Sequence, residues 1–136
     1  MPDLLTHEEY QAIGKSLDFP TNAFINGQFQ ASKSGNTFET INPATGQVIA
    51  KIAACNADDV ERAVTKARES LDQRHWSKLH PSERKEALIQ LSKLIKRIIQ
   101  ELAVMESIDS GKPIRDCVTI DLPETIDCLL WHAEAV

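Results

Sequence analysis

Two long helical patterns of this chain meet at the stretch Glu106-Ser-Ile-Asp-Ser-Gly-Lys-Pro113. Gly111 can adopt the left-handed backbone conformation that closes a helix, and Pro113 stops that helix from continuing. The stretch therefore predicts where one helix ends and the next begins.

Asp109 is the unusual residue of this stretch, because a carboxylate in the last turn of a helix faces the negative end of the helix dipole. Glu106 lies three residues earlier on the same face and adds like-charge repulsion. The two candidates for a compensating cation are the side chain of Lys112 and a bound ion. From the charges alone, a surface acid tolerated near Lys112 is favoured over a cation site, and both interpretations stay open.

Before this stretch, apolar residues recur at alternating spacings of three and four, as in a helix with one buried face. Pro81 opens the pattern at a first-turn position, where proline is well tolerated. The pattern is long enough for two helices in tandem, with a kink near residues 99–100. The residues expected to form its core-facing stripe are Leu88, Leu91, Ile95, Ile98, Leu102 and Met105.

After the stretch, residues 114–120 predict one or two helical turns. Asp121 with Glu124 then predicts a capping box for a final helix, with Pro123 in its first turn. No capping residue follows Val136, so we expect the chain to be the beginning of a longer protein. The expected buried face of the final helix comprises Leu122, Ile126, Leu129, Leu130 and Ala133.

Residues 1–22 are interpreted as an arm with a short helix from Thr6 to Asp18, which Thr6 and Glu9 cap. Residues 23–30 predict a hairpin, because both positions of the turn Asn26-Gly27 tolerate the positive φ that a tight hairpin needs.

The next two strands are expected at residues 37–41 and 47–53, joined by a turn that has Pro43 early and Gly46 late. Together with the hairpin they predict a small antiparallel β unit. Asn56 then caps a helix that ends near residue 72. The face of this helix expected to be buried comprises Val60, Val64, Ala67 and Leu71.

The composition excludes several classes of protein. The net charge is −5, and no basic block is longer than two residues, which argues against nucleic acid as a partner. No apolar run approaches the roughly 20 residues of a membrane-spanning helix. The three cysteines are odd in number and form no CxxC pair, which is typical of a reducing compartment and predicts a cytoplasmic protein.

The search for chemistry assigns no catalytic and no cofactor-binding residue. No glycine-rich phosphate loop and no G-x-S-x-G motif is present. Neither the cysteines nor the histidines have the spacing of zinc ligands. Packing is the favoured role of Cys55, Cys117 and Cys128, and His132 is interpreted as a satisfied or exposed histidine rather than a base.

Four blocks of the sequence give the chain a family resemblance. They are residues 24–29 (FINGQF), 40–46 (TINPATG), 59–64 (DVERAV) and 106–113 (ESIDSGKP). In this order and spacing they resemble the N-terminal part of the NAD(P)-dependent aldehyde dehydrogenase superfamily. Residues 111–116 (GKPIRD), 121–123 (DLP) and 131–135 (WHAEA) are most similar to γ-glutamyl-γ-aminobutyraldehyde and betaine aldehyde dehydrogenases.

The resemblance implies an α/β fold in which residues 23–136 form the incomplete N-terminal portion of a coenzyme-binding domain, with short antiparallel strands followed by packed helices. It implies that the full-length enzyme oxidises an aldehyde to a carboxylic acid with NAD or NADP, as a dimer or tetramer. The family's nucleophilic cysteine lies beyond residue 136, so this segment alone is expected to be inactive.

The resemblance also implies a site for a monovalent cation, Na⁺ or K⁺. Its ligands in this numbering are the backbone carbonyls of Thr40 and Ile41 and the carboxylate of Asp109. With the resemblance added, the cation site becomes the favoured interpretation of Asp109.

Two other hypotheses stay open. The chain could be a complete, non-catalytic helical module that buries its Leu/Ile stripe in an oligomer, or a degenerate fragment of an incomplete gene. The sequence decides neither which aldehyde is oxidised nor whether NAD or NADP is preferred.

Overall fold

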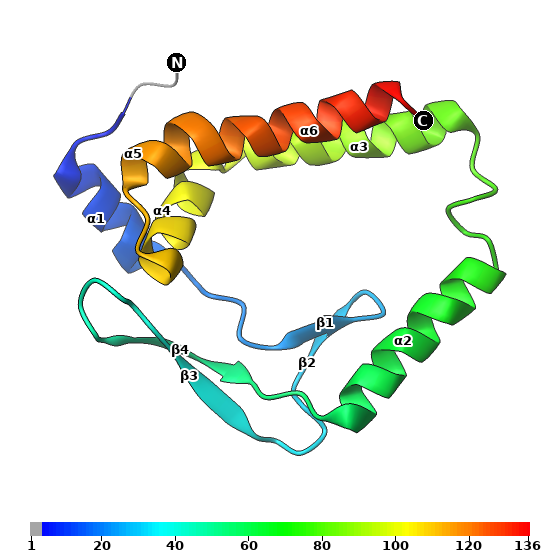
Figure 1. Ribbon diagram of the computed structural model, residues 1–136, viewed down its shortest axis with the longest axis horizontal. Helices are drawn as coiled ribbons and strands as arrows, with labels where there is room; N and C mark the ends of the chain where they lie inside the picture. Colours follow the sequence, from blue (N-terminus) through cyan, green and yellow to red (C-terminus); the bar gives the residue numbers. More distant parts are fainter. Residues whose placement is uncertain (1–3) are drawn as a thin grey trace. The chain divides into compact units, whose positions relative to one another are not determined.

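In the computed structural model of the chain, residues 4–136 are described, and the first three residues of the predicted arm lie outside them. The fold is α/β, with short antiparallel strands and packed helices, as predicted (Figure 1). In chain order the elements are α1 (His7–Ser16), β1 (Ala23–Ile25), β2 (Gln28–Gln30), β3 (Thr37–Ile41), β4 (Val48–Ala53), α2 (Ala57–Asp72), α3 (Pro81–Arg97), α4 (Ile99–Ser110), α5 (Ile114–Asp116), the π-helical turn η1 (Cys117–Asp121) and α6 (Leu122–Glu134).

The chain forms two compact units. The first contains α1, the turn Asn42–Thr45 and all residues from His80 onward. The second contains the segments Phe19–Ile41 and Gly46–Leu79. The assignment of residues 1–22 as an arm and 23–136 as part of one domain stays a prediction.

The first unit is built on α3 and α6, which run antiparallel and side by side (Figure 1). The predicted kink is confirmed, because α3 and α4 meet at Ile98, whose backbone (φ −115°, ψ 31°) leaves the helical region. The core of this unit consists of Ala103, Cys117, Val118 and Leu122.

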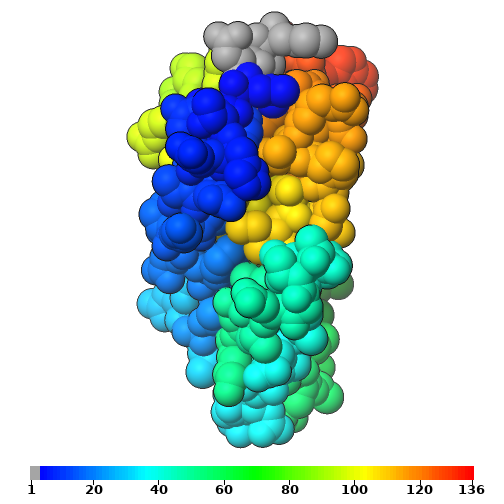
Figure 2. All heavy atoms as spheres, turned by 90° about the vertical axis from the view of Figure 1, so that its left-hand side faces the viewer, coloured from blue at the N-terminus to red at the C-terminus, as the bar shows by residue number. Residues whose placement is uncertain are grey.

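Helix α1 lies against α4, as the blue and yellow segments of Figure 2 show. The predicted cap is confirmed, since Thr6 and Glu9 bond each other's backbone amides. Gly14 allows the close approach, because a Cβ atom there would lie 3.3 Å from Cδ1 of Ile108. The arm therefore packs on a helix of its own unit.

The predicted start of the final helix is confirmed, with α6 beginning at Leu122 and Pro123 in its first turn, but the capping box predicted there was wrong. Asp121 has helical backbone angles and makes no capping hydrogen bond, because the chain runs without a break from α5 through η1 into α6. Leu122 donates its amide hydrogen to the carbonyl of Cys117 across the widened turn. A π-turn is a place where an α-helix absorbs an irregularity, and here it ends two residues before Pro123, which lacks an amide hydrogen.

The predicted stripe of α3 and α4 is only partly buried. Leu91 and Ile98 are 44% and 40% exposed, whereas Leu88, Ile95 and Leu102 are half-buried. The buried residue of α3 is Ser92, at 4% exposed, so the buried side of this helix coincides only partly with the apolar stripe.

The second unit contains two separate two-stranded antiparallel sheets, β1–β2 and β3–β4, rather than one four-stranded unit. The predicted tight turn is confirmed, with positive φ at Asn26 (53°) and Gly27 (76°). After β2 the chain leaves the hairpin for a loop at residues 31–36, so β2 and β3 do not pair.

The predicted buried face of α2 was also wrong. Val60, Val64 and Leu71 are 57%, 61% and 59% exposed, and the buried residue of α2 is Asp59, at 1%. Helix α2 is fixed through polar contacts of its first turn, which the periodicity of apolar residues cannot show. Among residues 4–136, no helix combines the length and the apolar character needed to cross a bilayer.

Candidate functional site

The end of α4 has the geometry that its sequence predicts. Gly111 is left-handed (φ 76°), and its amide hydrogen bonds the carbonyl of Ser107 at 3.0 Å. A Cβ atom added to Gly111 would lie 2.7 Å from Cγ of Pro43. The helix-ending block thus touches the Asn-Pro turn, and this contact lies within the first unit.

Lys112 is held at three points. Its amide donates to Oγ of Ser110 (3.2 Å), its carbonyl accepts from Oγ of Ser107 (2.6 Å), and its Nζ lies 2.6 Å from the carboxylate of Asp121. The hydrogen bond with Asp121 raises the pKa of Lys112 above its ordinary value of 10.5. Lys112, which is one of the two cations considered for Asp109, therefore forms an ion pair with Asp121.

The predicted cation ligands lie on two elements. Thr40 and Ile41 end β3 in the second unit, where the pairing shifts by one residue, so that Thr40 faces Ala50 and Ile41 faces Val48. Asp109 lies in the last turn of α4 in the first unit, with an exposed side chain.

Carboxylate and carbonyl oxygens are the hard donors that Na⁺ and K⁺ accept, so the residue types fit. Within residues 4–136, no group of three or more His, Cys, Asp or Glu side chains could hold a metal ion. A cation would therefore depend on backbone carbonyls. The set Thr40, Ile41 and Asp109 stays a prediction.

The three cysteines are free, and they have different surroundings. Cys117 is fully buried, which confirms its packing role, and burial is the main cause that raises the pKa of its thiol. Cys55 and Cys128 are exposed, so their predicted packing role was wrong. Cys55 lies in the segment between β4 and α2, and Cys128 lies in α6.

Within residues 4–136, Cys128 and His132 form a thiol–imidazole pair, with 3.6 Å between Sγ and Nδ1. Nδ1 also lies 2.8 Å from the backbone carbonyl of Cys128, to which it must donate a hydrogen. A protonated Nδ1 cannot take the proton of the thiol, so the pair lacks a general base. His132 is exposed and satisfied, as predicted.

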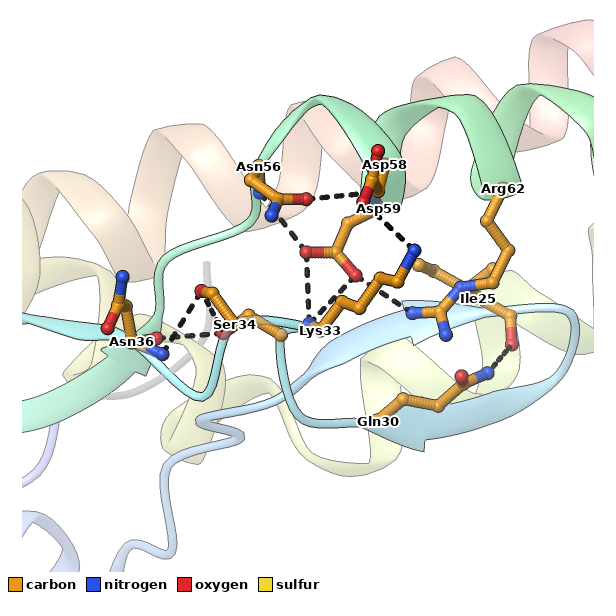
Figure 3. Close-up of polar contacts among 10 residues, drawn as sticks. Ile25, Gln30, Lys33, Ser34, Asn36, Asn56, Asp58, Asp59 and Arg62 are labelled. Carbon is orange, nitrogen blue, oxygen red and sulfur yellow. Dashed lines mark hydrogen bonds and ion pairs between the residues drawn. The ribbon is translucent and has the colours of Figure 1, made fainter.

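The second unit is organised around a buried carboxylate, Asp59, which sequence reasoning placed only in the first turn of a helix (Figure 3). Its oxygens accept hydrogen bonds from the amide of Lys33 (3.0 and 3.1 Å), the amide of Asn56 (3.1 Å) and Nη2 of Arg62 (3.1 Å). Asn56 in turn caps the amide of Asp59 at 3.2 Å. One side chain thus joins the loop after β2 to the start of α2.

Part of this arrangement has a sequence signal. Asn56 and Asp59 have the spacing of a capping box, with an acid three residues after the capping residue. The bond to Lys33 has no such signal, since it joins residues 26 positions apart. The neighbouring Asp58 is exposed and pairs with the ammonium of Lys33 at 2.9 Å.

Comparisons with known proteins agree on one family. Residues 29–136 match the aldehyde dehydrogenase family. The whole chain is 52% identical to an aminoacetaldehyde dehydrogenase of Pseudomonas aeruginosa, of which it covers 27%. Over 93% of the chain, it is 38% identical to the NADP/NAD-dependent aldehyde dehydrogenase PuuC of Escherichia coli, covering 26% of that protein.

A solved structure gives the same result for the fold. The γ-glutamyl-γ-aminobutyraldehyde dehydrogenase of Burkholderia cenocepacia superposes with a TM-score of 0.94 at 38% identity, over 96% of this chain and 27% of that one. The chain thus spans about a quarter of the length of the relatives that it matches.

Proposed function

Because the chain belongs to the aldehyde dehydrogenase family, we propose that it forms part of an enzyme that oxidises an aldehyde to a carboxylic acid with NAD or NADP. The observation that carries this proposal is the family match over residues 29–136, together with 52% identity along the whole chain to an enzyme of that activity. NAD or NADP supplies the hydride acceptor when it is bound.

The substrate class that we propose is an aminoaldehyde. Two relatives support this choice, because one is named for aminoacetaldehyde and another for γ-glutamyl-γ-aminobutyraldehyde. Both compounds carry a nitrogen function on a short chain that ends in an aldehyde. Betaine aldehyde belongs to the same chemical class and is included because of the resemblance in the sequence.

The contribution of these 136 residues is structural rather than chemical. A nucleophilic cysteine needs an accessible sulfur that is present as the thiolate. Cys117 has no accessible sulfur, and its raised pKa disfavours the thiolate. Cys128 lacks a base, and Cys55 belongs to no hydrogen-bonded pair with a histidine in the described part of the chain. We therefore place the nucleophile outside residues 1–136 and assign residues 23–136 to the coenzyme-binding domain.

We further propose a monovalent cation, Na⁺ or K⁺, bound by Asp109 and the carbonyls of Thr40 and Ile41. Support comes from the family resemblance and from the donor types. The test compares thermal stability in K⁺ and in a large organic cation. Asp109→Ala should abolish the extra stability in K⁺, whereas Asp127→Ala, an exposed acid of α6, should preserve it. An equal loss in both salts would make Asp109 a surface acid.

For the whole protein we propose a cytoplasmic homo-oligomer, a dimer or a tetramer. The free cysteines support a reducing compartment. A non-catalytic interaction module is the second candidate, favoured by exposed apolar side chains such as Phe24, Phe29 and Trp131. The mass of the native gene product separates the two, because the enzyme should be about four times heavier than the 15.2 kDa of this chain.

The proposed activity is tested on the product of the intact gene. Reduction of NAD⁺ and NADP⁺ is followed with aminoacetaldehyde, γ-glutamyl-γ-aminobutyraldehyde, betaine aldehyde and a simple aliphatic aldehyde as control. We expect turnover with at least one nitrogen-bearing aldehyde at a higher kcat/KM than with the control. Turnover with the control alone would overturn the substrate class, and no turnover with any aldehyde would overturn the activity.

A further inference from the structure

Gly111 differs from the other left-handed glycines of the chain. Gly27, Gly35, Gly46 and Gly111 all have φ between 70° and 76°. A Cβ atom added to any of the first three would meet nothing within 4 Å, whereas at Gly111 it would lie 2.7 Å from Cγ of Pro43. Backbone conformation alone explains the first three, but at Gly111 the missing side chain is also space that another residue fills.

The turn that fills this space is rigid. The ring of Pro43 is closed on the backbone, so Cγ cannot rotate away as the end of a flexible side chain would. The turn Asn42–Thr45 carries two hydrogen bonds of its own, from the amide of Ala44 to Oδ1 of Asn42 (2.9 Å) and from the amide of Thr45 to the carbonyl of Asn42 (3.3 Å). The ring of Pro43 is thus held in a fixed position by the turn.

The opposite side of the contact is equally fixed. Gly111 bonds Ser107 of the last helical turn, and Lys112 is anchored at its amide, its carbonyl and its ammonium group. The Lys112–Asp121 pair ties this segment to η1, so the segment cannot easily move back from Pro43.

We propose that Pro43 and Gly111 form a latch, in which the proline ring seats in the space left by the glycine and fixes the turn Asn42–Thr45 on the C-terminal end of α4. The latch joins two of the sequence blocks that carry the family resemblance. It depends on neither the aldehyde oxidation nor the cation site. The quantity that tests the latch is the rate at which the turn Asn42–Thr45 opens.

The test measures amide hydrogen exchange of Thr45 in the full chain, because this amide reports opening of the turn. Gly111→Ala should speed the exchange about tenfold, which corresponds to roughly 1.4 kcal/mol. The matched control is Gly35→Ala, which imposes the same left-handed strain where a methyl group meets nothing, and it should leave the exchange of Thr45 unchanged. Equal rates for Gly111→Ala and the parent chain would overturn the latch.

Pro43→Ala provides a second route that keeps Gly111 and so avoids strain in α4. It removes the atom at 2.7 Å and leaves the neighbouring Cβ at 3.6 Å, an ordinary contact distance. This variant alone should also speed the exchange of Thr45. In its background, adding Gly111→Ala should cause little further change, because the methyl group now has room. A full additional tenfold increase would show that backbone strain acts alone and would overturn the role of the contact.

Discussion

The two units of this chain are stabilised by different means. In the first, the buried residues are mostly apolar, and Ala103, Cys117, Val118 and Leu122 form one core. In the second, the three buried residues are Ile25, Ser32 and Asp59, and two of these are polar. The first unit depends on the burial of apolar surface, whereas the second depends on a carboxylate whose hydrogen bonds join a loop to a helix. The amphipathic pattern of α3 and α4 is therefore partly buried in the first unit, whereas the similar pattern of α2 stays exposed in the second.

The largest effect is expected from Asp59→Ala in the second unit. The change leaves the backbone amides of Lys33 and Asn56 without their acceptor and Arg62 without its ion pair. The expected loss of stability is about 3 kcal/mol, because several hydrogen bonds to one charged carboxylate are lost together. Amide exchange in α2 measures it.

The control for this change is the adjacent Asp58→Ala. Asp58 pairs with Lys33 through side chains that are more than half exposed, and such pairs contribute at most about 1 kcal/mol. Similar losses for the two variants would show that the buried carboxylate of Asp59 contributes no more to stability than an exposed ion pair.

The next effect is expected from Leu122→Ala in the core of the first unit. Leu122 is 8% exposed, and truncation leaves a hole beside Val118 and Cys117. The expected loss is about 2–3 kcal/mol, read from amide exchange in α4 and α6. Leu71→Ala removes the same group from the exposed face of α2 and should cost less than about 0.5 kcal/mol. A larger loss of stability for Leu71→Ala than for Leu122→Ala would contradict the claim that apolar burial stabilises the first unit and not α2.

The smallest effect is expected at the Lys112–Asp121 pair, and it depends on pH. Because Asp121 raises the pKa of Lys112, the stabilisation that this ion pair gives is present in full below the ordinary lysine pKa of 10.5. It is lost as the pH rises through the raised pKa. Lys112→Met should therefore lower the midpoint of thermal unfolding at neutral pH, with the difference closing in strong alkali. Asp121→Asn should behave in the same way. A difference that persists undiminished in alkali would assign the loss to packing of the lysine stem.

Local signals in the sequence predicted much of the fold. The features that depend on a few neighbouring residues are all confirmed. They are the cap at Thr6, the hairpin turn at Asn26-Gly27, the helix ends at Asp72 and Gly111, and the start of α3 at Pro81. These features follow from backbone geometry that the residue itself imposes.

The errors concern contacts between distant residues. The apolar face of α2 is exposed while Asp59 of its first turn is buried, and the carboxylate of Asp121 pairs with Lys112 instead of capping α6. Periodicity identifies an apolar face but not the surface that covers it. The proposed cation ligands Thr40, Ile41 and Asp109 were likewise identified by resemblance and not by any local pattern. The contact of Pro43 with Gly111 became visible only in three dimensions.

These residues carry the fold of an aldehyde dehydrogenase, and we propose that its nucleophile lies outside them. The most direct measurement is NAD⁺ and NADP⁺ reduction with an aminoaldehyde by the 136-residue chain alone and by the intact gene product carrying Cys55→Ser and Cys128→Ser. We predict no turnover by the chain alone and an unchanged rate for the substituted product relative to its parent. Turnover by the chain alone, or loss of activity on replacing these two cysteines, would contradict the claim.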